Sequence, residues 1–332
     1  MKIVLDAMGS DQNPVPDVEG AVLAARAYGV TVILVGDEAK IKTELAKHKI
    51  DGLNLPIVHA ASAIGMTEHV EAVKEKKDAS MNVGMQLVKQ KQADAFVTAG
   101  NTGAAMAAAI VGPCALGRIK GIKRPALTAA LPNPTGRTLL LDIGANADVK
   151  PEYLYQFALM GSIYAEKCMR IPKPRVGLLS NGEEEGKGPL VVRDAYAMIR
   201  ANPKINFVGN AEGRDIPKGT MDVIVCDGYV GNVAIKLSES LAKTLIGFIK
   251  EEIKKRPIAV VGAALSKGAF DALKVRLDPS EIGGGILLGV DGVIIIGHGS
   301  SNANAVKNAI RVAKEAVEGN VVSLIASGLQ GS

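Results

Sequence analysis

Short apolar segments of three to five residues alternate with helical patterns along the chain, and this alternation constrains the fold more than any other feature. The apolar segments are rich in Val, Ile and Leu, as expected of strands covered on both faces. We predict strands at 3–5, 31–35, 95–98, 139–141, 176–179, 223–226 and 293–296. We predict helices at 16–28, 38–47, 79–91, 152–168, 189–200 and 302–318. Such alternation is typical of an α/β protein with a mainly parallel sheet.

Residues 237–279 depart from this alternation. Their apolar positions follow helical spacing from Leu237 to Ile253, Pro257 interrupts the pattern, and a second helical segment follows at 258–276. Two successive helices with no strand between them indicate a helical protrusion from the sheet. Two interpretations stay open. The helices belong to the core or to a dimer interface, or they form a basic amphipathic hairpin that contacts a membrane surface or an acidic partner.

The composition excludes several classes of protein. The 332 residues suit two domains or one large α/β domain, and three cysteines are too few for a disulfide framework. No spacing of His and Cys suggests a protein-held metal. An aromatic fraction of 3% with no Trp argues against nucleic-acid binding, whereas a net charge of +5 favours an acidic partner. With no signal peptide and no apolar segment long enough to span a membrane, we expect a cytoplasmic protein.

Glycine, asparagine, aspartate and serine gather directly after six of the predicted strands. In open α/β sheets, ligands bind outside the carboxyl ends of the strands, so we expect these loops to meet at one edge of the sheet and form the site. The alternative is that these residues only form turns and helix N-caps. The candidate substrate-binding residues are Gly9, Gly100, Asn101, Thr102, Gly103, Asp142, Asn146, Asn181, Glu183, Arg193, Asp227, Gly231, Ser300 and Ser301.

Two residues stand out for their reactivity. Lys187 lies in a glycine-rich loop before a predicted helix, where an ammonium group and backbone N–H groups would clamp a phosphate. The alternative is a solvated loop lysine. His298 ends the predicted strand 293–296 and would donate a proton or bind phosphate near neutral pH. The alternative is a structural anchor for the last helix.

A basic cluster precedes the apolar run 126–131. We define this basic cluster as Arg118, Lys120, Lys123 and Arg124. Such clusters are commonly solvated surface, but its position near the 98–103 loop also suits the docking of an acidic partner.

Several catalytic motifs are absent from the sequence. No G-x-G-x-x-G follows the first predicted strand, which weakens the case for a dinucleotide-binding dehydrogenase. The segment 182–188 imitates a phosphate-binding P-loop but is one residue too short. No G-x-S-x-G elbow is present, which disfavours an acyl-enzyme on serine and favours direct attack by a second substrate.

Taken together, the loop motifs resemble those of the bacterial acyl-carrier-protein:phosphate acyltransferases, the PlsX family. The resemblance extends from Lys2 to about Ala316. Each motif is weak alone, but their number and order are specific. The matching segments are 6–9, 99–104, 124–126, 142–146, 182–188, 206–210, 212–215, 226–232 and 298–301.

The resemblance implies transfer of a fatty acyl group from acyl carrier protein to inorganic phosphate, giving acyl phosphate for phospholipid synthesis. It implies a three-layer α/β/α fold like that of the isocitrate and isopropylmalate dehydrogenases, in one domain over 1–332 with the 237–279 protrusion serving dimer or membrane contact. A homodimer, peripheral membrane association, no cofactor and a downstream membrane acyltransferase of glycerol 3-phosphate as a further partner are also expected.

The implied reaction suggests roles for particular residues. Phosphate dianion is already a nucleophile, so the enzyme must mainly position it. We hypothesise that Lys187 clamps phosphate and that His298 orients it or handles a proton. Attack on the thioester creates an oxyanion, for which Asn101, Asn146, Asn232 or loop N–H groups are candidate donors, with Asn232 taken as the catalytic candidate. The alternatives are a short-chain phosphate acetyltransferase, a nicotinamide-dependent dehydrogenase on the same fold, or a non-catalytic acyl-binding module recruited to membranes.

Overall fold

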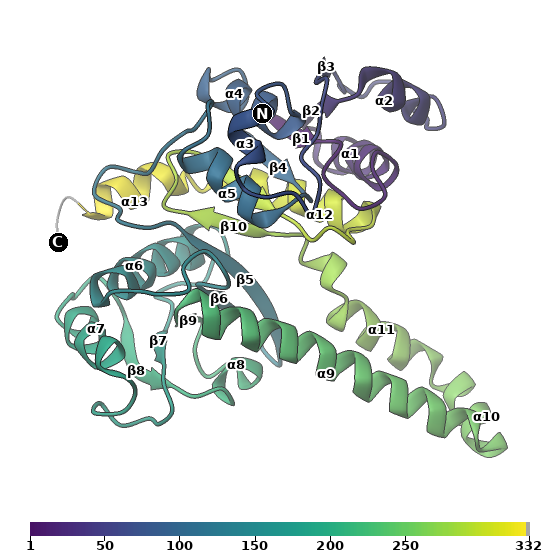
Figure 1. Cartoon of the computed structure of the whole chain (residues 1–332). Coiled ribbons are helices and arrows are strands. Elements are labelled where there is room, and N and C mark those ends of the chain that lie inside the picture. Colours follow the sequence, from purple (N-terminus) through teal and green to yellow (C-terminus); the bar gives the residue numbers. More distant parts are fainter. Residues whose placement is uncertain (330–332) are drawn as a thin grey trace.

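The computed structural model of the chain describes residues 1–329, and residues 330–332 lie outside the described part (Figure 1). The strands are β1 (Lys2–Asp6), β2 (Thr31–Gly36), β3 (Ile57–His59), β4 (Ala95–Thr98), β5 (Ala126–Asn133), β6 (Gly136–Leu141), β7 (Val176–Leu179), β8 (Phe207–Ala211), β9 (Val223–Val225), β10 (Gly285–Leu288) and β11 (Val293–Ile296). The helices are α1 (Val15–Tyr28), α2 (Glu38–Leu45), α3 (Ala72–Glu75), α4 (Ser80–Lys89), α5 (Thr102–Ile110), α6 (Pro151–Lys167), α7 (Leu190–Arg200), α8 (Asp215–Lys218), α9 (Gly228–Lys254), α10 (Pro257–Leu265), α11 (Lys267–Leu277), a 3₁₀ turn η1 (Pro279–Glu281), α12 (Ala303–Glu318) and α13 (Val321–Leu329). All seven predicted strands are present, so the sequence pattern is confirmed at these positions.

The strands form one sheet, and the strands in its two halves run in opposite directions. Within residues 1–329 the sheet has 11 strands in the order β3-β2-β1-β4-β11-β10-β5-β6-β9-β7-β8. The strands β3, β2, β1, β4 and β11 are mutually parallel and form the first block. The strands β6, β9, β7 and β8 are also parallel to one another and form the second block. The predicted α/β class with a mainly parallel sheet is confirmed.

The two blocks are joined by antiparallel pairings. β10 is antiparallel to β11 and to β5, and β5 is antiparallel to β6. Three successive reversals turn the second block against the first. Our prediction that six strand-end loops meet at one edge of the sheet is therefore wrong, because the loops after β1, β4 and β11 leave one edge and those after β6, β7 and β9 leave the other.

Alternating side chains along each strand supply two separate hydrophobic layers. In β1, Ile3 and Leu5 pack in the layer that includes residues of α1, α6 and α12, whereas Val4 packs in the layer of α4 and α5. In β6, Leu139 joins the first of these layers, and Leu140 joins a smaller cluster beside α8 and α9. Helices thus cover both faces of the sheet, as Figure 1 shows.

The helices α9, α10 and α11 project from the body of the molecule (Figure 1). α9 is 27 residues long, and its buried residues are only Gly228 and Gly231, at its first turn. Neither α10 nor α11 contains a buried residue. Large apolar side chains on this arm are exposed, with Ile258 at 89% and Leu265 at 86%. Among residues 1–329, no helix combines the length and the apolar character needed to cross a membrane.

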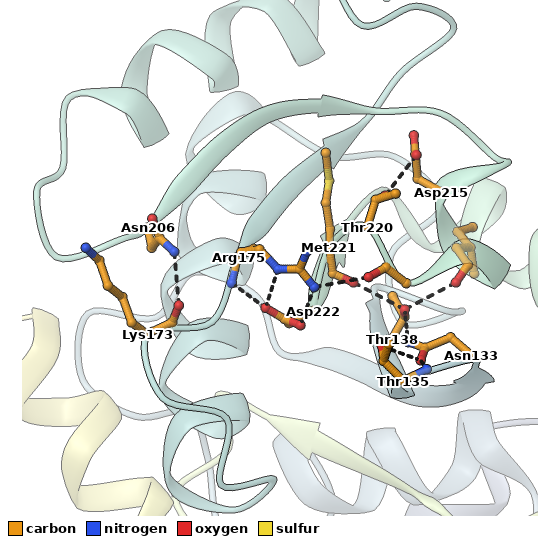
Figure 2. A network of polar contacts seen from close by, with 12 residues as sticks. Asn133, Thr135, Thr138, Lys173, Arg175, Asn206, Asp215, Thr220, Met221 and Asp222 are labelled. Atoms are coloured by element: carbon orange, nitrogen blue, oxygen red, sulfur yellow. Dashed lines mark hydrogen bonds and ion pairs between the residues drawn. The ribbon is translucent and has the colours of Figure 1, made fainter.

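A polar network holds the second block together at the starts of its strands (Figure 2). Arg175, just before β7, donates from Nε and Nη2 to the two carboxylate oxygens of Asp222, just before β9, at 3.0 and 2.9 Å. The backbone N–H of Arg175 donates to the same carboxylate at 2.8 Å. Burial alone would raise the pKa of Asp222, but the hydrogen bonds and charge of Arg175 outweigh this effect and lower it. The pair therefore favours the ionised carboxylate in the folded protein.

We predict that Asp222→Asn lowers the free energy of unfolding by about 1–3 kcal/mol near neutral pH, because it removes a charge-assisted bidentate contact. The side chain of Asp222 is only 19% exposed, so solvent weakens the pair little. Since the folded pKa is depressed, this stabilisation is present above the ordinary pKa and is lost as pH falls through the folded pKa. Urea unfolding between pH 3 and 7 measures this difference.

The control is Glu185→Gln, which breaks the exposed ion pair between Glu185 and Arg200, whose side chains are 60% and 63% exposed. We expect a change below about 1 kcal/mol there. Equal losses in the two variants would contradict the prediction.

Candidate active site

The loops after β1 and β4 touch each other at the first edge of the sheet. The Asp6 carboxylate accepts from the Met8 N–H at 3.1 Å and from Thr98 Oγ1 at 2.9 Å. A Cβ on Gly9 would lie 2.8 Å from Thr98 Oγ1 and 2.9 Å from the Gly100 nitrogen. Only glycine therefore lets the two loops approach so closely. Burial raises the pKa of Asp6, against the opposing effect of its hydrogen bonds.

The β1 loop is also joined to the loop after β11. The backbone N–H of Asp11 donates to the carbonyl of Gly299 at 2.8 Å. Next to Asp11, Ser10 donates from Oγ to Asp17 Oδ2 at 2.5 Å, and Asp17 is completely buried in the first turn of α1. Burial raises the pKa of Asp17 to about 7, and the nearby charge of Asp6 adds to this effect. A buried carboxylate thus supports the loop that contacts the His298 loop.

His298 lies in a pocket of about 260 Å³ at this edge. Its Nδ1 accepts from the Ser300 backbone N–H at 3.2 Å and lies 2.8 Å from Ser300 Oγ. Because Nδ1 accepts a hydrogen bond from a backbone donor, the neutral ring carries its proton on Nε2. Ser301 donates from Oγ to the carbonyl of His298 at 2.5 Å. The pocket is also lined by Glu239 and Lys243 of α9.

The sequence did not single out Lys243. Lys243 lies in a segment with the apolar periodicity of a helix, where a lysine is ordinarily a solvated surface charge. Only the path of α9 brings it to the His298 pocket. The side chain is exposed, and no ion pair is found for it among the described residues. Its position gives this pocket a cation that is not neutralised by a salt bridge.

The loop after β6 is built around Asp142, which is completely buried. Its Oδ1 accepts from the N–H groups of Leu127, Gly144 and Ala145 at 2.9–3.1 Å. Its Oδ2 accepts from the backbone and side-chain nitrogens of Asn146 at 2.7 and 2.8 Å. Burial raises the pKa of Asp142, against these hydrogen bonds. Both oxygens are committed to the loop itself, so binding of substrate by Asp142 stays a prediction.

The amino end of α9 packs against the β6 loop. A Cβ on Gly231 would lie 1.9 Å from the carbonyl oxygen of Asp142, so this contact requires glycine. Asp227 is the N-cap of α9 and accepts from the Val230 N–H at 2.8 Å. Asn232 donates from Nδ2 to the carbonyl of Ile143 at 3.2 Å. These residues therefore have structural partners, and their roles in substrate binding and catalysis stay predictions.

Lys187 lies in a separate pocket of about 370 Å³. The residues that line it are Asn181, Gly182, Glu183, Glu184, Lys187, Glu212 and Arg214. Arg214 contacts Glu183 at 2.8 Å and Glu212 at 2.5 Å, so its charge is already balanced. Lys187 is exposed, and the described residues supply no ion pair for it. The pocket has three carboxylates and two cations, so the net charge that one chain supplies to its lining disfavours the binding of an anion.

The remaining predicted site residues lie at helix ends and on the surface. Asn101 is the N-cap of α5, which begins at Thr102 and Gly103, and it accepts from the Ala104 N–H at 3.0 Å. Arg193 is exposed on α7 and does not line the Lys187 pocket. All four members of the basic cluster are exposed, and no carboxylate within residues 1–329 pairs with them. The buried side chains of Ile119 and Ile122 anchor the cluster to the core.

The three predicted catalytic residues are thus not brought into one pocket. His298 lies at the first edge of the sheet, whereas Lys187 lies in the loop after β7 and Asn232 lies near the start of α9, which follows β9. Helix α9 connects the two regions, since it carries Asn232 near its start and Lys243 three turns further along. At 1.5 Å per residue, these two positions are roughly 16 Å apart along the helix axis.

Solved structures of other proteins share this architecture. The EutD phosphotransacetylase from Staphylococcus aureus superposes with a TM-score of 0.62 at 15% sequence identity, covering 95% of this chain and 94% of that one. This likeness shows that the fold is that of the phosphotransacylases. The family model described as "Fatty acid synthesis protein" matches residues 1–324.

Two relatives named phosphate acyltransferase are similar over nearly their whole length. The protein from Pelotomaculum thermopropionicum is 52% identical, over 99% of this chain and 95% of the relative. The protein from Acidobacterium capsulatum is 53% identical, over 94% and 92%. The chain belongs to this fatty acid synthesis protein family, and the resemblance to the PlsX acyltransferases predicted from the loop motifs is confirmed.

The buried Asp17 predicts a pH dependence of stability. Its pKa of about 7 in the folded protein exceeds the ordinary 3.8, so the folded state holds a proton that the unfolded state has lost. This group alone makes the free energy of unfolding fall as pH rises from about 4 to 7, by up to ~1.4 kcal/mol per pH unit. Asp17→Asn keeps an acceptor for Ser10 but cannot ionise, so it gains stability relative to the parent as pH rises.

Urea unfolding at pH 5, 6, 7 and 8 tests this prediction. Asp51→Asn, at an exposed turn, is the control for loss of one carboxylate. A constant difference between the Asp17 variant and the parent over this range would show that Asp17 is ionised throughout.

Proposed function

We propose that this chain transfers a fatty acyl group from acyl carrier protein to inorganic phosphate. Phosphate attacks the thioester carbonyl directly, the carbon–sulfur bond breaks, and the products are acyl phosphate and the carrier thiol. The acyl phosphate then serves phosphatidic acid synthesis. The observation that carries this proposal is the identity of about half of all residues, over almost the whole chain, to relatives named phosphate acyltransferase. It favours this reaction over the dehydrogenase and the non-catalytic alternatives.

The His298 pocket is the best-suited phosphate site. The Nε2–H of His298 and the ammonium of Lys243 are donors around one small cavity, and Ser300 fixes the imidazole by its contacts with Nδ1. The amino end of α12, a helix of 16 residues, adjoins it and contributes partial positive charge. Donors of this kind hold phosphate and offset its charge, which is the main task when phosphate itself is the nucleophile. Glu239 also lines the cavity and would oppose a further negative charge.

Hydrogen-bond accounting distinguishes the three asparagines proposed for the oxyanion. Asn101 donates both side-chain hydrogens, to the carbonyls of Met66 and Glu68. Asn146 also donates both, to the Pro125 carbonyl and to Asp142. Asn232 donates one hydrogen to Ile143 and keeps the other. Asn232 is therefore the side chain best able to stabilise the oxyanion, which supports its assignment as the catalytic candidate.

Lys187 remains our second candidate for binding phosphate. Within residues 1–329 its ammonium has no acidic partner within 4 Å, and the neighbouring Arg214 holds two of the three carboxylates of the pocket. If the second block closed towards the His298 pocket, Lys187 would approach the phosphate that we place there. In this proposal Lys187 contacts the substrate only in the closed protein.

The exposed basic cluster supports docking of acyl carrier protein, an acidic partner. The exposed apolar side chains of α9–α11 support contact with a second copy of the chain, with a membrane surface, or with both. We accordingly propose a homodimer in the cytoplasm with peripheral membrane association, which hands its product to a membrane acyltransferase of glycerol 3-phosphate.

The reaction is tested by trapping acyl phosphate with hydroxylamine. Purified protein with long-chain acyl carrier protein should form acyl hydroxamate faster than a protein-free control, in which hydroxylamine attacks the thioester directly, only when phosphate is present. We expect His298→Ala and Lys187→Ala each to lower kcat/KM at least tenfold, because each removes a phosphate donor. Arg200→Gln, an exposed change on α7, is the control. Phosphate-independent product would contradict direct attack, and full activity of either alanine variant would refute that residue's assignment.

Docking is tested by reversing charge in the basic cluster. The double variant Lys120→Glu, Arg124→Glu should raise KM for acyl carrier protein roughly tenfold or more at low salt and leave kcat nearly unchanged. The effect should shrink as ionic strength rises, because exposed charges are screened. Lys49→Glu together with Lys91→Glu changes the net charge equally on other surfaces. Equal effects of the two double variants would show that only net charge matters.

A further inference from the structure

A third, larger cavity lies on the sheet face opposite α9. Its volume is about 880 Å³, within the roughly 300–1,000 Å³ typical of small-molecule sites. Its floor is formed by β5 and β6, through Thr128, Ala130 and Leu139. Its walls come from the end of α6 and from α12. It shares no lining residue with the pockets around His298 or Lys187.

The topology of the sheet explains why this face is open. Parallel strands need crossover helices, and these helices then cover the sheet. The strands β10, β5 and β6 pair antiparallel, and β5 joins β6 by a hairpin with no helix between them. α6 contacts the second block, including β6, and α12 contacts the first block and β10, whereas β5 has no comparable contact with either helix, so a gap remains over part of β5 on this face. The cavity therefore follows from the joining of two oppositely directed blocks.

The cavity contains a guanidinium group without a carboxylate partner. Arg137 is half-buried, and within residues 1–329 its guanidinium makes one hydrogen bond, from Nη2 to the carbonyl of Glu281 at 3.2 Å. No ion pair involves Arg137 among residues 1–329, although Glu281 and Glu315 attract it from further away. Burial lowers the pKa of Arg137, and the neighbouring charge of Arg311 lowers it further. An anion beside this side chain would relieve both effects and use its remaining N–H donors.

The carboxylates that line the cavity are already engaged. Glu315 accepts from Arg311 at 2.8 Å, and Asp222 is held by Arg175 in the network of Figure 2. Asn133, also in Figure 2, donates its amide to Thr138 at 2.9 Å. These groups neither cancel the charge of Arg137 nor compete strongly for a ligand.

Tyr164 supplies a second polar group to the cavity. The residue is only 7% exposed and lines the cavity, and its hydroxyl forms no hydrogen bond with another group of residues 1–329. Its electrostatic neighbours are Cys168, Arg137, Arg311 and Glu315, all of which also line the cavity. A buried tyrosine hydroxyl ordinarily finds a hydrogen-bond partner. A bound ligand would supply one.

We propose that this cavity binds an amphipathic anion, an alkyl chain that ends in a carboxylate or a phosphate. The guanidinium of Arg137 and the hydroxyl of Tyr164 bind the head group. The apolar side chains of Leu139, Ile171 and Val312 contact the chain. The proposal does not depend on the proposed reaction, because the cavity lies outside the residues assigned to catalysis. Since its two walls belong to different blocks, a ligand there also bridges the two halves of the sheet.

Calorimetry on the full-length protein tests this proposal with decanoate, decyl phosphate, inorganic phosphate, acetate and 1-decanol. Binding of decanoate or decyl phosphate, much tighter than that of the other three, is the expected result, and the two anions identify the preferred head group. Arg137→Gln should weaken this binding at least tenfold, and Arg200→Gln should not change it. Ala130→Leu, which fills part of the cavity and leaves its charge intact, should also weaken binding.

Photolabelling locates the site. Decanoate with a terminal diazirine should label peptides that contain Ile171 or Val312 in the parent protein and lose this labelling in Arg137→Gln. A far-ultraviolet circular-dichroism spectrum and a cooperative urea unfolding transition like those of the parent show that the Arg137→Gln variant is folded. Equal binding of 1-decanol, unchanged binding in the Arg137 variant, or labelling confined to other peptides would each overturn the proposal.

Discussion

The reversal of strand direction at the β5–β6 hairpin is the constraint on which the rest of this molecule depends. Two parallel blocks share one continuous sheet in opposite directions only where an odd number of antiparallel pairings separates them. The pairings of β11 with β10, β10 with β5 and β5 with β6 supply three. The reversal sends the strand-end loops to two edges. It also leaves a gap between α6 and α12 over part of β5, and a cavity of about 880 Å³ lies there.

Most polar loop residues are occupied in holding the loops themselves. Both carboxylate oxygens of Asp142 accept internal hydrogen bonds, and Asn101 and Asn146 donate both of their amide hydrogens. This self-support makes the loops rigid, a requirement for donors that must be in place before charge develops. The few groups left over, such as the second N–H of Asn232 and Nε2 of His298, become the natural candidates for contact with substrate.

The periodicity of the sequence predicted the fold class and seven strands, because Val, Ile and Leu segments buried on both faces leave a clear local signal. β10 gave a weaker signal, since its segment begins in the glycines 283–285 and has no crossover helix beside it. The polar loop residues were identified from the sequence. Whether they bind substrate or only form turns and helix N-caps depends on where their side-chain hydrogens point, which the sequence does not specify. Lys243 was missed because its sequence neighbourhood is an ordinary amphipathic helix.

The sequence by itself determined which segments become strands, which loops carry Gly and Asn, and which family the chain resembles, since these depend on local pattern and on motif order. Only the tertiary structure decided the edge at which each loop emerges, the approach of α9 to His298, and the isolation of Arg137 from carboxylates. These properties depend on strand pairing between segments more than a hundred residues apart, such as β5 with β10. No local pattern encodes the direction of that pairing.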